Sequence, residues 1–225
     1  IIAVIIAVVL VIAGVVFFLR DRPAFGPEQD WTKGAYYGAR GTYFADVTGD
    51  RRADAIVVHE IGVEVVRQSD GAQFLPSKNW SRNAFYGTRG TYFADVSGDG
   101  MADAIAVVDD GVLIRRSDNT LFLEIENWTN GAYYGTQGTF FADVTGDGKA
   151  DAIVNNAGRI TVRRSTGTRF NPNEDWTKGV FAGTRGNFFA DVNGDGKADA
   201  IVVNDDAVMV RLSDGSQFIS AQSWI

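Results

Sequence analysis

A pattern of acidic and apolar residues, D-V-x-G-D-x-x-A-D-A-I, occurs four times in the chain at nearly constant spacing. The copies begin 49, 48 and 48 residues apart, at Asp46, Asp95, Asp143 and Asp191. Apolar runs flank the acidic part of each copy, such as residues 140–142 before residues 143–151 of the third copy and 152–154 after them. Self-similarity at a period of roughly 20–50 residues indicates a repeat architecture, in which each period forms one supersecondary unit. This repeat therefore constrains the fold more than any other feature of the sequence.

Each repeat has the pattern of four short strands. In the third repeat we expect strands at residues 139–144, 152–155, 159–164 and 168–172. Ile160 and Val162 alternate with polar residues, which is the period of a strand with two unlike faces. Pairs such as Asp70-Gly71 predict hairpin turns. Four antiparallel strands per repeat predict propeller blades, so the expected fold is an all-β propeller of four four-stranded blades, each of about 48 residues.

The conserved spacing within each copy suggests a metal-binding loop between two strands. The third copy has oxygen-bearing side chains at its first, third, fifth and ninth positions, namely Asp143, Thr145, Asp147 and Asp151. Hard cations such as calcium take about six to eight oxygen ligands. Gly148 suits a sharp turn with positive φ, which would make the Lys149 carbonyl a natural backbone ligand. The alternative is that the aspartates cap the turns through side-chain to backbone hydrogen bonds without a metal.

The repeat D-V-x-G-D-G-x-A-D, preceded by Gly-x-x-Gly-x-aromatic-Phe, resembles the FG-GAP or VCBS-type repeat. That repeat is similar to the blades of integrin α-subunit propellers and of some fungal lectins. The resemblance covers about residues 25–225. It implies that calcium is held by the side chains at positions one, three, five and nine and by the carbonyl at position seven. It leaves the role open, since such blades serve adhesion, sugar binding and scaffolding.

The expected loops occupy residues 46–54, 95–103, 143–151 and 191–199. Their expected calcium ligands are Asp46, Thr48, Asp50, Arg52, Asp54, Asp95, Ser97, Asp99, Met101, Asp103, Asp143, Thr145, Asp147, Lys149, Asp151, Asp191, Asn193, Asp195, Lys197 and Asp199. Up to four calcium ions are therefore expected.

The four loops differ in their ligand chemistry. The fourth matches best, because Asn193 offers a carbonyl oxygen at position three, where Ser97 and Thr145 offer hydroxyl groups. The first loop has Arg51 in place of the turn glycine, followed by Arg52. These residues remove the easy turn and place positive charge beside the metal. We therefore predict that the first site is the weakest and the fourth the strongest.

Composition is consistent with local acidic sites. The formal charge is −7, and 12 of the 28 acidic residues lie in the four loops. Four calcium ions would bring the charge to +1, so the acidity is largely a property of the loops. It gives no support for nucleic-acid binding, which requires a basic face. The chain has no cysteine, so disulfides cannot stabilise it, whereas metal binding could.

Catalysis has little support in the sequence. His59 is the single histidine and has no counterpart in the other repeats. Thiol catalysis and the usual zinc sites are excluded by the absence of cysteine and by this single histidine. Carboxylate pairs suitable for glycoside hydrolysis occur only in the acidic loops, where their spacing suits calcium. We therefore expect that the protein is not an enzyme.

The N-terminal residues predict a membrane anchor. Residues 1–19 carry no charged or polar side chain, and a helix of that length covers about 28 Å, close to the thickness of a bilayer core. A cleaved signal peptide is the alternative, but its basic start and small-residue cleavage site are not visible. We therefore expect a single transmembrane α-helix at residues 1–20, a linker at 21–30 and the propeller domain at 31–225.

Two recurring groups of side chains could serve packing or binding. The aromatic link begins at Trp31, Trp80, Trp128 and Trp176 and contains Tyr36, Phe85, Tyr133 and Phe181. One interpretation is packing between blades, which is favoured for the tryptophans and for the second aromatic of each link. The other interpretation is that Tyr36, Phe85, Tyr133 and Phe181 partly face solvent and stack on sugars or a protein. An arginine recurs between two glycines in three repeats, and the third repeat has a glutamine there: Arg40, Arg89, Gln137 and Arg185. These could line a central tunnel or form salt bridges with the acidic loops.

The segment Phe-x5-Trp occurs five times, although there are only four acidic loops: Phe25/Trp31, Phe74/Trp80, Phe122/Trp128, Phe170/Trp176 and Phe218/Trp224. We predict that the C-terminal copy completes the fourth blade and that the four blades close into one ring, because an open sheet edge invites association. Closure requires contact between residues 42–47 and 187–192. The alternative is an open array that continues with further blades or pairs with a partner's edge.

These observations predict a membrane-anchored, calcium-binding propeller that serves binding or assembly. Loops of this kind are filled where calcium is abundant, so we expect a periplasmic or extracellular location. One hypothesis is adhesion or ligand recognition, with a protein or a glycan as partner. The other is an accessory subunit whose helix docks into a larger membrane protein complex. A detergent extraction that tests for co-purification would separate the two.

Overall fold

The computed structural model describes residues 28–60, 64–219 and 222–223. The predicted transmembrane helix at residues 1–20, most of the linker and the first Phe-x5-Trp phenylalanine lie outside the described residues. The chain divides into two units, Ile1–Lys33 and Gly34–Ile225, and every strand of the described residues belongs to the second. The described residues form strands, turns and loops, and they include no helix that could cross a membrane.

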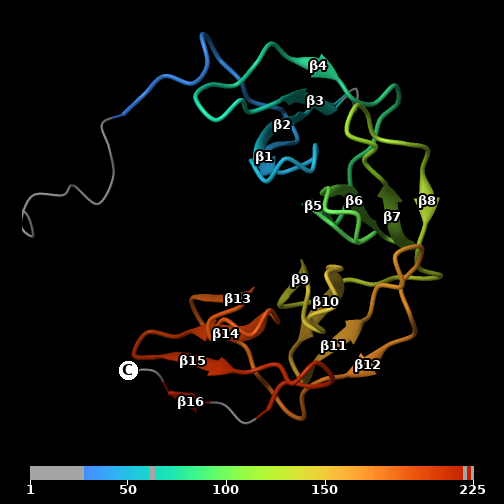
Figure 1. Cartoon of the computed structure of the whole chain (residues 1–225). Helices are drawn as coiled ribbons and strands as arrows, with labels where there is room; N and C mark the ends of the chain where they lie inside the picture. The colour runs from blue at the N-terminus through green and yellow to red at the C-terminus, as the bar shows by residue number, and fades with distance from the viewer. Residues whose placement is uncertain (1–27, 61–63, 220–221, 224–225) are drawn as a thin grey trace, which may run out of the picture. The chain divides into compact units, whose positions relative to one another are not determined.

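The described strands form four four-stranded antiparallel sheets, each in sequence order (Figure 1). The first comprises β1 (Gly41–Ala45), β2 (Asp54–Val58), β3 (Glu64–Arg67) and β4 (Lys78–Asn79), and the second β5 (Gly90–Ala94), β6 (Asp103–Val108), β7 (Gly111–Arg115) and β8 (Glu126–Asn127). The third comprises β9 (Gly138–Ala142), β10 (Asp151–Asn156), β11 (Arg159–Arg163) and β12 (Glu174–Asp175), and the fourth β13 (Gly186–Ala190), β14 (Asp199–Val203), β15 (Val208–Arg211) and β16 (Gln222–Ser223). The predicted all-β propeller of four blades is confirmed.

The core lies between consecutive blades. In the third blade Ile153 pairs with Phe140 of β9 and Val162 of β11, so one face of the sheet presents three apolar side chains. That face packs in one cluster with buried residues of the fourth blade, including Ala200 and Val202. Full burial of an aliphatic side chain contributes about 1.5–3 kcal/mol. Because each blade buries its apolar face only against its neighbour, the blades stabilise one another.

A tryptophan and a phenylalanine join each blade to the next. Trp128 follows the outer strand of the second blade, and its ring lies edge-on to Phe170 of the third, with centroids 5.3 Å apart. The Phe170 N–H donates to the Trp128 carbonyl at 3.2 Å. The same pair recurs for Trp80 with Phe122 and for Trp176 with Phe218. The predicted packing role of the tryptophans between blades is therefore confirmed.

The predicted fourth strand at residues 168–172 is wrong. Phe170 forms only an isolated bridge with Ser165, and the outer strand β12 begins at Glu174. The reason is that the backbone N–H of Phe170 bonds to the preceding blade, so this segment leaves its own sheet. The aromatic residue of Phe-x5-Trp thus joins two blades, and the strand forms just before the tryptophan.

The predicted contact that would close the ring is absent. The innermost strands contact one another from β1 to β5, from β5 to β9 and from β9 to β13, whereas β1 and β13 make no contact within the described residues. Accordingly Phe44 of β1 and Phe188 of β13 are 63% and 52% exposed, because neither has a neighbouring blade against it. The prediction that the C-terminal segment completes the fourth blade is confirmed, since β16 pairs with β15.

Candidate functional site

Each acidic loop folds around the carboxylate at its first position. In the third loop the Asp143 Oδ1 atom accepts the N–H groups of Gly146 at 2.6 Å and of Asp147 at 3.2 Å. Its Oδ2 atom accepts the N–H of Gly148 at 2.8 Å. Asp46, Asp95 and Asp191 accept equivalent backbone donors. The turn-capping hydrogen bonds that formed the metal-free alternative are therefore present in all four loops.

The ninth position of each loop is a buried structural carboxylate. Asp151 is 0% exposed, and its two oxygens accept the N–H groups of Ser165 at 2.8 Å and of Val144 at 3.2 Å. The carboxylates with the same burial and equivalent donors are Asp54, Asp103 and Asp199. Each one ties the loop to the turn that follows the third strand of its own blade.

Burial also changes the acidity of these carboxylates. Loss of hydration raises the pKa of Asp103 and of Asp151 to about 7, and their backbone donors only partly offset this effect. The pKa of Asp54 is raised for the same reason. Near neutral pH, a proton and a bound cation would therefore compete for these carboxylates.

The fifth position is paired with the seventh in three loops. The Lys149 ammonium lies 2.9 Å from Asp147, and the Lys197 ammonium lies 2.9 Å from Asp195. In the first loop Arg52 makes the corresponding ion pair with Asp50. In the second loop Met101 occupies the seventh position, and Asp99 has no basic partner within the described residues.

The predicted ligands of each loop lie on one turn, but their side-chain oxygens do not converge on a common coordination centre. Among the described residues, no group of three or more histidine, cysteine, aspartate or glutamate side chains lies close enough to hold a metal ion. The donor set is nevertheless all oxygen, which suits a hard cation. To contribute, a fifth-position carboxylate such as Asp147 must leave its ion pair with Lys149. Calcium binding therefore stays a prediction.

Consecutive loops are bonded to one another. The Ala150 N–H of the third loop donates to the Asp95 carbonyl of the second at 2.7 Å, and the Ser165 hydroxyl donates to the Val96 carbonyl at 2.5 Å. Both contacts recur at the other two junctions. A change in the geometry of one loop will therefore reach the next blade through its backbone.

The sixth position requires a left-handed backbone in every loop. Gly100, Gly148 and Gly196 have φ values of 85°, 83° and 84°, as the sequence predicts. Arg51 adopts the same region with φ of 67° and is one of two non-glycine residues that do so within the described residues. Because a Cβ atom is disfavoured there, the first loop carries backbone strain that the others avoid.

We expect Arg51→Gly to raise the free energy of unfolding by about 0.5–1 kcal/mol, because it removes this strain. The matched control is Gly196→Arg, which should lower it by a similar amount, since no atom lies within 4 Å of an added Cβ and backbone strain alone is introduced. Denaturant unfolding in metal-free buffer measures both. Loss of stability in Arg51→Gly would show that the arginine side chain outweighs the strain.

Most rings of the aromatic link are buried and do not face solvent. Phe85, Tyr133 and Phe181 are 2–4% exposed, so the interpretation in which they face solvent is wrong for these three, whereas Tyr36 is half-buried. The Tyr133 hydroxyl donates to the Ala152 carbonyl at 3.0 Å. The second aromatic of the link, predicted to pack, is instead exposed in the first repeat, where Tyr37 is 74% accessible.

The recurring arginines between two glycines do not bond to the acidic loops. Arg89 pairs with Asp109 at 2.6 Å and lies over the Tyr134 ring of the next repeat, 4.6 Å from its centroid. Arg185 pairs with Asp205 in the equivalent turn. The alternative of salt bridges with the acidic loops is therefore wrong for Arg89 and Arg185, because the turn after the second strand supplies the carboxylate.

Sequence reasoning missed three cavities at equivalent junctions between blades. Their volumes are about 670, 490 and 510 Å3. Each is lined by the Trp–Phe pair, by polar residues after the tryptophan and by an arginine at or near the end of the third strand, which is Arg115, Arg163 or Arg211. The signal in the sequence is this arginine, which recurs 48 residues apart.

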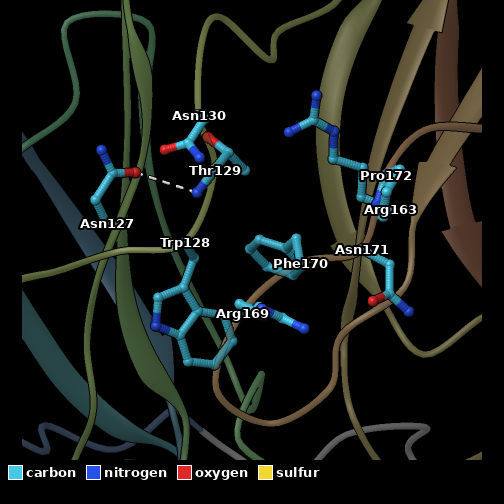
Figure 2. Close-up of a pocket in the computed structure, with 9 residues that line it drawn as sticks. All are labelled: Asn127, Trp128, Thr129, Asn130, Arg163, Arg169, Phe170, Asn171 and Pro172. Atoms are coloured by element: carbon cyan, nitrogen blue, oxygen red, sulfur yellow. Dashed lines mark hydrogen bonds between the residues drawn. The ribbon is translucent and has the colours of Figure 1, made fainter.

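The second of these cavities illustrates the arrangement (Figure 2). Trp128 and Phe170 lie together, and in this view the guanidinium groups of Arg163 and Arg169 lie on opposite sides of the Phe170 ring. The Arg163 guanidinium also stacks 4.4 Å from the centroid of Tyr133. Asn130 adds an exposed amide at the rim. The lining thus combines polar amide and guanidinium groups with two rings that are themselves only 3% and 6% exposed.

Comparison with known proteins identifies the repeats. The model of the FG-GAP-like repeat matches residues 95–154 and 143–202. No curated protein matches the chain. Two of the similar solved structures are an Agrocybe aegerita lectin that recognises non-reducing terminal N-acetylglucosamine and the Photorhabdus luminescens Tc holotoxin pore.

The lectin is 24% identical, with a TM-score of 0.65, and the match covers 81% of this chain and 51% of the lectin chain. The toxin is 14% identical, with a TM-score of 0.44, over 81% of this chain and 12% of the toxin chain. This chain therefore spans about half the length of the lectin and a small part of the toxin. At these identities only the likeness to the lectin is informative, and it concerns the fold. The four observed sheets make the chain a four-bladed β-propeller, and its residues 95–202 match FG-GAP-like repeats.

Proposed function

We propose that this propeller is a non-catalytic binding module whose ligand is a glycan. The observation that carries the proposal is the recurrence of one cavity at three blade junctions. A repeated site of modest size suits a repeated ligand, because several weak contacts then combine into high avidity. The similar Agrocybe aegerita lectin, which recognises terminal N-acetylglucosamine, supports the same class of ligand.

The lining of the cavities supports a sugar more than an extended peptide. Sugar rings carry several hydroxyl groups, which suit a cavity lined by amide and guanidinium groups beside buried rings. The second cavity provides Trp128 and Phe170 together with Asn130, Arg169 and Asn171. A peptide would instead be expected to use a free sheet edge or a long groove.

Calcium and a membrane anchor complete the proposal. The acidic loops are proposed to hold calcium through the oxygen atoms of positions one, three, five, seven and nine, which the FG-GAP-like repeat supports. Bound calcium would neutralise the carboxylates and fix the loops that connect one blade to the next.

Residues 1–19 are proposed to anchor the module in a membrane, with the propeller on the periplasmic or extracellular side, where calcium is abundant.

Asn171→Ala should weaken glycan binding at least about threefold at the second cavity, because it removes an amide at the rim without touching the Trp–Phe pair. Thr88→Ala is the matched control: Thr88 is exposed and lines none of the three cavities. A glycan array that includes terminal N-acetylglucosamine, followed by calorimetry, measures the effect. A well-folded protein that binds no glycan would contradict the proposed function.

A further inference from the structure

The blade-junction cavities concentrate positive charge in an acidic protein. The whole chain has 21 basic and 28 acidic residues. The cavities are lined by the basic residues Arg82, Arg115, Arg163, Arg169, Lys178 and Arg211, against the acidic residues Glu124 and Asp175. Asp175 is already paired with Arg159 at 2.6 Å. The field inside the cavities is therefore opposite in sign to that of the chain as a whole.

Arg115 in the first cavity is the most deeply buried of these cations. Its residue is 4% exposed, and its Nε atom has no hydrogen-bond partner within the described residues. Its guanidinium lies 5.3 Å from the centroid of the Phe85 ring, and it forms no ion pair within the described residues. A buried cation without a counter-charge is costly, since the ring replaces only part of its lost hydration. A ligand anion in this cavity would supply the missing partner.

Trp80, which lines the same cavity, carries a second unpaired donor on its side toward Lys78. Its indole Nε1 has no partner within the described residues, although the side chain is 1% exposed. The equivalent atoms of Trp128 and Trp176 donate to Glu126 at 3.0 Å and to Glu174 at 3.4 Å. The first blade has Lys78 where the second and third blades have these glutamates. The acceptor that satisfies the other two tryptophans is therefore replaced here by a cation.

We propose that the cavity lined by Trp80, Arg82 and Arg115 binds the anionic group of an acidic saccharide, either a carboxylate or a sulfate ester. The inference rests on the proposed glycan-binding function and adds the chemical class of the ligand. A guanidinium binds an oxyanion through charge-assisted hydrogen bonds, and Arg82 and Arg115 bring two guanidinium groups to this one cavity. Glu124 also lines this cavity, and its negative charge repels ligands whose anionic group lies outside the cavity.

The test compares three saccharides: methyl β-glucuronide, N-acetylglucosamine 6-sulfate and N-acetylglucosamine. Binding to the full chain is measured by calorimetry in calcium, at low and at high salt. The acidic ligands should bind at least about tenfold more tightly than the neutral one at low salt, and the difference should shrink at high salt. The two acidic ligands distinguish a carboxylate from a sulfate as the recognised group.

Arg115→Met should abolish one acidic-ligand site per chain or weaken it at least about tenfold, because it removes the charge and keeps an apolar side chain on Phe85. Arg115→Lys keeps the charge and should retain part of the binding. Arg185→Met is the control, since it removes the same charge from an exposed ion pair that lines none of the three cavities.

The outcomes separate the two proposals. Equal or tighter binding of the neutral sugar, or acidic-ligand binding that Arg115→Met leaves unchanged, overturns the anionic ligand while glycan binding stands. Absence of binding by all three saccharides to a folded wild type, together with a negative glycan array, overturns both. Thermal unfolding of each variant shows whether lost binding reflects lost structure.

Discussion

Replacing Asp151 with alanine is expected to lower the free energy of unfolding of the propeller by about 3–5 kcal/mol. The carboxylate is fully buried and accepts the N–H groups of Val144 and Ser165. Without it, two backbone donors remain buried and unpaired, and each costs about 1–3 kcal/mol. The change also loosens the turn through which the Ser165 hydroxyl reaches the second blade.

Asp118→Ala is the matched control for this variant. Asp118 likewise accepts two backbone donors, from Thr120 and Leu121, but it is exposed, so water replaces the lost bonds. Its loss should cost about 1 kcal/mol or less. Asp151→Asn keeps one acceptor oxygen, so its loss in free energy of unfolding should fall between those of Asp151→Ala and Asp118→Ala. Denaturant unfolding without metal measures all three, and equal losses for Asp151→Ala and Asp118→Ala would contradict a structural role that depends on burial.

The period and alternation of the sequence were enough to predict the fold. Four copies at constant spacing can bury their apolar faces only against one another, which leaves few architectures. The pattern could not locate the outer strand, because Phe170 pairs with the backbone of a neighbouring blade. Likewise, closure depends on the geometry of the whole array, and the spacing of Phe-x5-Trp segments does not encode whether β1 meets β13.

The candidate sites were predictable only where one loop contains them. Asp143, Thr145 and Asp147 are near in sequence, and their turn forms as expected. The same pattern cannot tell a calcium ligand from a hydrogen-bond acceptor, because a carboxylate oxygen serves both. The cavities escaped prediction because their walls come from different blades: Trp80 and Arg115 meet only after two sheets have packed.

Removal of calcium is expected to destabilise the protein more than any exposed single substitution. A ligand that binds only the folded state stabilises it by about 2.7 kcal/mol per site at a hundredfold excess over its dissociation constant. For a domain of this size each kcal/mol shifts the midpoint of thermal unfolding by about 2–4 °C. Occupation of two or more loops should therefore raise the midpoint by at least about 10 °C over chelated protein.

The pH dependence of this effect follows from the buried aspartates. Their folded-state pKa of about 7 lies above the ordinary value of 3.8, so the metal-free protein gains stability from their protonation. That contribution is complete below about pH 4 and is lost as the pH rises through 7. Calcium must displace these protons from Asp103 and Asp151, so its stabilising effect should be larger at pH 8 than at pH 6.

The loops should differ in their share of this stabilisation. Asp195→Ala in the fourth loop should remove more of the calcium-dependent shift than Asp50→Ala in the first. In the first loop Arg51 strains the turn, whereas the fourth loop has Gly196 at this position, and the fifth position is paired with the seventh in both loops. Two cationic side chains in the first loop also oppose the approach of a metal ion. Thermal unfolding of both variants, with calcium and with chelator, measures the order. The reverse order would refute the ranking, and an unchanged wild-type midpoint would refute calcium binding itself.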